Sequence, residues 1–185
     1  MTTALPILRT PRCLIRLAVP ADAPQLLAYR LENREHLSPW EPMREASYYT
    51  LSECSRIIAE AEAAARADRG YSLLLFNADA VEIIGSITLS NVARGPFQAC
   101  ILGYGVGARW QGFGLMKEAL EATLAWAFGA LSLHRVMANH LPDNERSARL
   151  LERLGFEREG YARAYLKIAG SWRDHVLTAK IRSED

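Results

Sequence analysis

The chain has few of the residues that usually carry disulfides or metal sites. It contains three cysteines and four histidines in 185 residues. Cys13, Cys54 and Cys100 are odd in number, far apart and without a CxxC pair, which argues against a disulfide framework and a zinc site. The histidines form no HxxxH-type pattern. We therefore expect no metal, and we expect the thiols to be unreactive core residues.

The chain also lacks a long apolar run and an excess of one charge. Its formal net charge is +1, with acidic and basic residues interspersed. This balance argues against a nucleic-acid-binding protein. No uncharged apolar run approaches the length of a membrane span, and residues 1–13 show no apolar segment typical of an export signal. We expect a cytoplasmic protein without a membrane segment, and the sequence leaves its oligomeric state open.

Residues 1–185 are expected to form a single domain, because the chain shows no repeat and no dividing linker. Periodicity and turn signals predict seven strands and four helices. The predicted strands cover 12–18, 71–76, 82–90, 98–106, 134–141, 158–168 and 172–181, and the predicted helices cover 22–34, 51–70, 114–128 and 144–154. This order favours an α+β fold with a mixed, mostly antiparallel sheet. Residues 36–49 are expected to form neither helix nor strand.

A glycine-rich segment, GYGVGARWQGFGLM at 103–116, joins a predicted strand to a predicted helix. The first N–H groups of a helix have no intrahelical partner, and the helix dipole adds positive charge there. Glycines without Cβ atoms let a pyrophosphate approach such a turn. The alternative interpretation is a tight turn with a packing role only. A Rossmann fold is disfavoured, because the segment does not follow the first strand of a βαβ series.

Two motifs identify a family resemblance. The first is Q/R-x-x-G-x-G/A, and the second is N-x-x-S followed by L-x-x-x-GF. They are matched by Gln111, Gly114, Met116, Asn144, Ser147, Leu151, Gly155 and Phe156. With them the chain resembles the GCN5-related N-acetyltransferase (GNAT) superfamily. Further similarity at 32–42, 83–104, 110–120, 134–162 and 170–179 resembles the RimJ/RimL type, in which we expect the departure of Met116 from Gly or Ala.

The resemblance implies that acetyl-CoA is the co-substrate and that no metal takes part. It places the pyrophosphate on backbone N–H groups of 111–116 and the pantetheine arm along 102–106, opposite a strand at 134–140. The residues expected to bind acetyl-CoA on this basis are Leu102, Tyr104, Val106, Gln111, Gly112, Phe113, Gly114, Leu115, Met116, Asn139, Asn144 and Ser147.

The resemblance further implies that Ser147 protonates the departing thiolate. Asn144 has a second interpretation, because PDN before a helix is typical of an N-cap. The loss of Ser147 should slow the enzyme without abolishing it, because a thiol with a pKa near 8.5 already leaves as a thiolate.

Glu159 is the candidate general base. The spacing of residues in the sequence does not favour it over four other candidates, Tyr165, His36, Glu41 and His175. Each of the five could instead have only a structural role. An α-amine with a pKa of about 7.7–8.0 is partly neutral near pH 7.5, so orientation together with deprotonation by water is a further alternative.

The acceptor is expected to meet the loop at 36–42. Trp40 lies between Pro39 and Pro42, which stiffen the loop, and we predict His36, Trp40 and Glu41 as substrate residues. The alternative is that the tryptophan only packs this loop onto the core.

The resemblance favours acetylation of the N-terminal α-amine of a ribosomal protein, at alanine or serine. The amine attacks directly in a ternary complex, and a backbone N–H near 105–107 stabilises the oxyanion. Two alternatives remain open: an acetyltransferase of small amines or antibiotics, and a non-catalytic CoA-binding factor associated with the ribosome.

Overall fold

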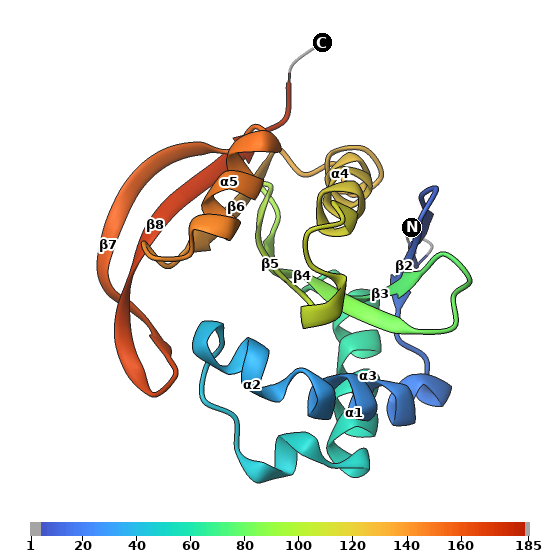
Figure 1. Cartoon of the computed structure of the whole chain (residues 1–185). Coiled ribbons are helices and arrows are strands. Elements are labelled where there is room, and N and C mark those ends of the chain that lie inside the picture. The colour runs from blue at the N-terminus through green and yellow to red at the C-terminus, as the bar shows by residue number, and fades with distance from the viewer. Residues whose placement is uncertain (1–4, 184–185) are drawn as a thin grey trace.

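Eight strands form one sheet in the computed structural model, which describes residues 5–183 (Figure 1). The strands are β1 (Ile7–Arg9), β2 (Cys13–Leu17), β3 (Tyr71–Asn77), β4 (Ile83–Ala93), β5 (Ala99–Val106), β6 (Arg135–His140), β7 (Glu157–Ile168) and β8 (Ser171–Ile181). Their order is β1-β2-β3-β4-β5-β6-β8-β7, and only β5 and β6 run parallel. The predicted mixed, mostly antiparallel sheet is confirmed. The extra strand β1 was missed because three residues are too short to show an alternating pattern.

Five α-helices accompany the sheet in the described residues, together with short 3₁₀ helices. The α-helices are α1 (Ala23–Glu32), α2 (Arg34–Leu37), α3 (Leu51–Arg66), α4 (Leu115–Phe128) and α5 (Glu145–Arg153), and the 3₁₀ helices are η1 (Pro20–Asp22), η2 (Ser38–Trp40), η3 (Ala46–Tyr49) and η4 (Ala108–Trp110). The expectation that 36–49 contains no helix is wrong, because the end of α2 lies there together with η2 and η3. Such short turns carry no 3.6-residue periodicity.

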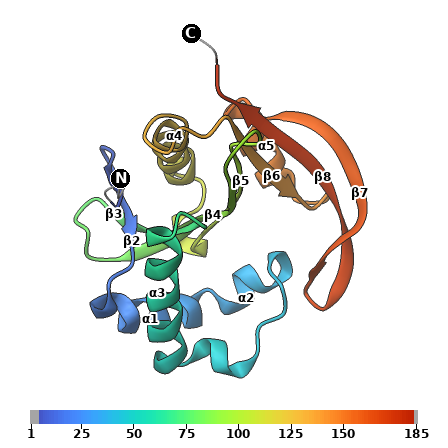
Figure 2. The ribbon, with the colours of Figure 1, turned by 180° about the vertical axis from the view of Figure 1, so that it is seen from behind.

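The sheet has a core on each face. Leu14, Leu74 and Phe76 pack with residues of α1 and α3, whereas Ile15 and Leu75 pack with residues of α4. The alternation along β2 and β3 sends neighbouring side chains to opposite faces. Figures 1 and 2 show the two groups of helices on opposite sides of these strands.

β5 and β6 pair over a short stretch and then separate. The parallel register covers Ala99↔Arg135, Cys100↔Val136 and Ile101↔Met137, after which β5 pairs only with β4. β5 continues to Val106 and β6 to His140. The gap between them leaves one edge of β5 without a strand partner beyond Ile101.

Cys13, Cys54 and Cys100 are buried free thiols, as predicted. Burial raises the pKa of Cys100 to about 12, so its thiol stays protonated and unreactive near neutral pH. Among the helices described, none has the length and apolar character that crossing a membrane requires.

Candidate active site

A cleft of about 1840 Å³ opens where β5 and β6 separate. Its walls come from the 102–106 stretch of β5, the loop at 110–117, the segment at 139–150 and the loop at 33–44. Figure 2 shows the long β7–β8 hairpin reaching from the sheet toward the α2 segment. The volume exceeds the roughly 300–1,000 Å³ of a typical small-molecule pocket, so two substrates have room together.

The loop before α4 is shaped to hold an anion. Gly112 and Gly114 have φ values of +84° and +75°, a conformation that other L-residues rarely adopt. Within the described residues, no backbone hydrogen bond uses the N–H groups of 112–117. Arg12 donates to the Phe113 carbonyl at 2.8 Å and pairs with Glu118, which holds the loop in place. The free N–H groups and the helix dipole fit a pyrophosphate.

The free edge of β5 presents backbone donors to the gap. The Gly107 N–H donates to the Ile84 carbonyl at 2.9 Å. Because bonded and non-bonded pairs alternate in an antiparallel ladder, the N–H groups of Tyr104 and Val106 then point away from β4. Within the segment expected to hold the oxyanion, 105–107, the Gly107 N–H is already used and Val106 is the residue that presents its N–H to the gap.

Tyr104 and Ser147 meet across the cleft. The Tyr104 hydroxyl lies 2.7 Å from the Ser147 Oγ. Burial raises the pKa of Tyr104 to about 12, so the phenol is neutral near pH 7. The Ser147 N–H donates to the Asn144 Oδ1 at 3.1 Å, which confirms the N-cap interpretation of Asn144. The cap and the phenol together fix the position of the Ser147 hydroxyl.

The Gln111 side chain joins two walls of the cleft. Its Nε2 donates to the His36 Nε2 at 2.9 Å, and Arg146 donates to its Oε1. The link therefore runs from α2 through the glycine loop to α5. His36 lines the cleft as expected, but its ring is engaged by Gln111.

The loop that carries Trp40 and Glu41 forms the wall opposite α5. Both residues line the cleft, and Trp40 is 42% exposed. The Ala169 N–H at the tip of the β7–β8 hairpin donates to the Glu41 carbonyl at 2.9 Å. The hairpin and the loop therefore close one side of the cleft together.

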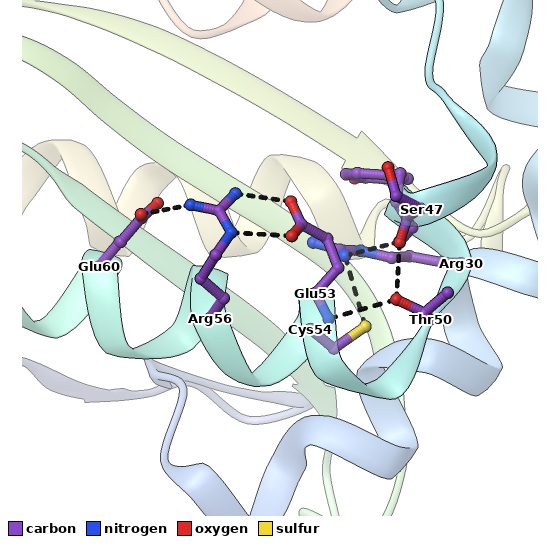
Figure 3. A network of polar contacts seen from close by, with 8 residues as sticks. Arg30, Ser47, Thr50, Glu53, Cys54, Arg56 and Glu60 are labelled. Atoms are coloured by element: carbon purple, nitrogen blue, oxygen red, sulfur yellow. Dashed lines mark hydrogen bonds and ion pairs between the residues drawn. The ribbon is translucent and has the colours of Figure 1, made fainter.

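Arg30 holds η3, the turn that follows this loop, against the body of the protein (Figure 3). Its Nη1 lies 3.1 Å from the Tyr48 carbonyl and 3.3 Å from the Cys54 Sγ. Its guanidinium carbon lies 3.9 Å from the centre of the Tyr48 ring. Thr50 caps α3 beside it by accepting from the Glu53 N–H at 3.3 Å. The η3 turn is thus held between α1, which carries Arg30, and α3.

The structure brings most of the predicted site residues to the cleft, with two exceptions. Phe113 does not line it, and its side chain is 62% exposed. Glu159 does not line it either, and pairs instead with Arg135. The cleft collects the other predicted residues, which are Leu102, Tyr104, Val106, Gln111, Gly112, Gly114, Leu115, Met116, Asn139, Asn144, Ser147, His36, Trp40 and Glu41.

Asn33 is a site residue that sequence reasoning missed. It is buried, its Oδ1 accepts from the Ala108 N–H at 2.9 Å, and its Nδ2 donates to the Tyr29 carbonyl at 2.9 Å. It therefore ties the end of β5 to α1. A single asparagine near the end of a helix carries no sequence signal for such a role.

Comparisons with known proteins agree with this geometry. Residues 12–157 match the acetyltransferase (GNAT) domain family. The [Ribosomal protein uS5]-alanine N-acetyltransferase of Escherichia coli strain K12 is 47% identical over 172 residues, which cover 93% of this chain and 89% of the relative. The probable N-acetyltransferase YjcK of Bacillus subtilis is 34% identical and covers 89% of this chain and 91% of its own length.

Two solved structures share the whole fold. The ribosomal-protein-S5-alanine acetyltransferase of Vibrio fischeri has a TM-score of 0.92 and 35% identity, covering 97% of this chain and 98% of its own. RimJ of Mycobacterium smegmatis, solved in complex with CoA-disulfide, has a TM-score of 0.88 and 32% identity, covering 96% of this chain and 86% of its own. This chain belongs to the acetyltransferase (GNAT) family and is an N-acetyltransferase.

Proposed function

We propose that this protein moves the acetyl group of acetyl-CoA to the N-terminal alanine of ribosomal protein uS5. The 47% identity to the Escherichia coli enzyme of that name, spread over 93% of the chain, carries this proposal. A cleft with room for two substrates and a wall built by the 33–44 loop supports a protein N-terminus as the acceptor.

The half of the cleft formed by β5, the glycine loop and α5, the donor half, has groups that fit each section of acetyl-CoA. The N–H groups of 112–117 hold the pyrophosphate, and the free edge of β5 at 102–106 pairs with the pantetheine amides. Acetyl-CoA supplies the acetyl group as an activated thioester. The Val106 N–H stabilises the negative charge that develops on the carbonyl oxygen.

Ser147 gives its hydroxyl proton to the sulfur as the C–S bond breaks. Tyr104 passes a proton to Ser147 across the 2.7 Å between their oxygens, and one of the two protons that leave the substrate nitrogen replaces it. The demand on this acid is modest, since a thiol with a pKa of about 8.5 is already a tolerable leaving group.

The test follows CoA release with a thiol reagent. The acceptors are a peptide with the N-terminal sequence of uS5 that begins with free alanine, the same peptide led by serine or lysine, its N-blocked form and a panel of small amines. We expect turnover with the free alanine peptide and none with the blocked one. Turnover with small amines alone, or acetyl-CoA binding without any turnover, would overturn the proposal.

A further inference from the structure

Acetyl transfer also requires a group that takes a proton from the acceptor's ammonium, and the residues of the donor half of the cleft do not supply it. We infer that His175 is this general base, accepting the proton at its Nε2. The inference rests on the proposed acetylation of an α-amine and adds a residue to it. His175 lies on β8, is 4% exposed and lines the cleft.

The hydrogen bonding of His175 sets its tautomer. Its Nδ1 lies 3.1 Å from the Arg173 carbonyl, which only accepts, so Nδ1 carries the hydrogen. The lone pair therefore resides on Nε2, which makes no hydrogen bond within the described part of the chain. This is the arrangement that a histidine base requires, with one nitrogen held by the backbone and the other free.

Sheet register places His175 on the acceptor side of the cleft. Asn139 is opposite Leu177, so its side chain shares a face with His175 two residues away. Contacts agree, because the Asn139 Nδ2 donates to the Tyr165 hydroxyl at 3.2 Å and the Tyr165 ring centre lies 5.4 Å from that of His175.

This face is also the one that α2 covers. Tyr104 packs toward α4 and α5, so its neighbour Gly105 faces the other way, and a Cβ on Gly105 would lie 3.7 Å from Leu37 of α2. An acceptor on the face that α2 covers meets His175, while the donor approaches from the side of α5.

Three other titratable groups of the cleft are engaged or turned away. His36 receives the hydrogen bond of Gln111, and Glu41 pairs with Arg44 at 3.4 Å. His140 shares its face with Val136 and Ala138, which pack with α4 and α5 on the donor side.

The surroundings keep His175 neutral and ready to accept a proton. Burial lowers its pKa from the usual histidine value, and the nearby charges of His140 and Arg173 act in the same direction. The hydrogen bond to the Arg173 carbonyl and the charge of Asp174 act to raise the pKa of His175, but the pKa stays below the usual histidine value. From β7, the facing group is the Tyr165 ring.

The reaction removes two protons from the substrate nitrogen. Nε2 takes one proton from the α-ammonium, and the freed lone pair forms the C–N bond with the acetyl carbon. The C–S bond breaks with its electron pair on sulfur, and Ser147 gives the thiolate a proton. The second proton that leaves the nitrogen replaces it through the Tyr104–Ser147 pair. The imidazolium returns its proton to water, so the products are an amide, a free thiol and one proton.

The test compares His175→Ala and His175→Gln with the native protein at saturating substrates from pH 5.5 to 9.5. His134→Gln is the matched control, because His134 is exposed and does not line the cleft. We expect both His175 variants to lose about 100-fold in kcat at pH 7. The loss should shrink at pH 9.5, where an α-amine with a pKa of about 7.7–8.0 is neutral without help. Added imidazole should restore at least tenfold to His175→Ala.

Retention of half the native kcat at pH 7, or an unchanged pH profile, would overturn the inference. Acetyl-CoA titration and circular dichroism check that the variants are folded. If neither variant folds, the pH profile of kcat for the native protein decides. A base at His175 requires kcat to fall on acidification as a histidine side chain becomes protonated. If the native protein acetylates no α-amine, the proposed function is wrong. If the native protein is active and the His175 variants are equally active, only the role of His175 is wrong.

Discussion

The Tyr104 hydroxyl and the Ser147 Oγ lie 2.7 Å apart and connect β5 to the first turn of α5. Forty-three positions separate the two residues in the chain. The contact spans the gap in the sheet at the height where β5 has lost its partner β6. It therefore couples the strand that offers backbone donors to the residue expected to protonate the leaving group.

Ser147→Ala should lower kcat about 10- to 100-fold, because it removes the proton donor but leaves the thiolate as a tolerable leaving group. Tyr104→Phe should cost less, and the double variant should be no slower than Ser147→Ala alone, because both act on one proton. Steady-state CoA release measures this. Tyr161→Phe is the control, since Tyr161 is 48% exposed and outside the cleft. If the losses in kcat of the two single variants added up fully in the double variant, Ser147 and Tyr104 would not act on the same proton.

Gly85→Ala should lower the free energy of unfolding by about 1–3 kcal/mol. A Cβ there would lie 2.6 Å from the Gly105 carbonyl oxygen and 3.3 Å from the Leu75 Cδ2, so β4 and β5 would have to shift. Gly103→Ala is the matched control on β5, because a Cβ at that position meets nothing within 4 Å. Urea denaturation should find it within about 0.5 kcal/mol of the native protein. Equal losses in both variants would show that the close approach is not the cause.

Tyr29→Phe should raise the free energy of unfolding by about 1 kcal/mol. The Tyr29 hydroxyl is buried without a hydrogen-bond partner in the described residues, and such a group costs about 1–3 kcal/mol. Tyr71→Phe should have the opposite sign, because the Tyr71 hydroxyl donates to Asp68 at 2.8 Å. Thermal and urea unfolding of both variants checks the pair. Destabilisation by Tyr29→Phe would show that a water or another partner satisfies the hydroxyl.

Asp22 should make stability depend on pH in the acid range. Burial acts to raise its pKa, but hydrogen bonds from Arg16 at 2.6 Å and from the Val19 N–H at 2.7 Å outweigh burial and lower it. A lowered folded pKa stabilises the protein above the unfolded value of about 3.9, and this contribution is lost as pH falls through the folded pKa.

Asp22→Asn should therefore cost about 2 kcal/mol at pH 7 and progressively less below pH 4. Urea denaturation from pH 2.5 to 7 measures the difference. Glu53→Gln is a control in which the carboxylate is on the surface of α3 and pairs with Arg56 at 2.6 Å. A difference between native protein and Asp22→Asn that stays constant with pH would contradict this role of Asp22.

Local features of the chain were predictable because neighbouring residues determine them. The Thr50 and Asn144 caps, the glycine loop at 111–116 and the long strands follow from turn chemistry and periodicity. β1 and the short turns of 36–49 were not predicted, since segments of three or four residues show no period. Their positions depend on packing against the sheet.

The general base could not be selected from the residues that neighbour each candidate in the sequence. Glu159 and His175 both follow the GF motif, and spacing treats them alike. β7 carries Glu159 to Arg135, outside the cleft, whereas β8 carries His175 into the cleft wall beside Tyr165. Periodicity and turn chemistry specify the elements and the glycine loop at 111–116, because both act between near neighbours. Strand register and the separation of β5 from β6 select which distant side chains meet, because these depend on packing across the whole sheet.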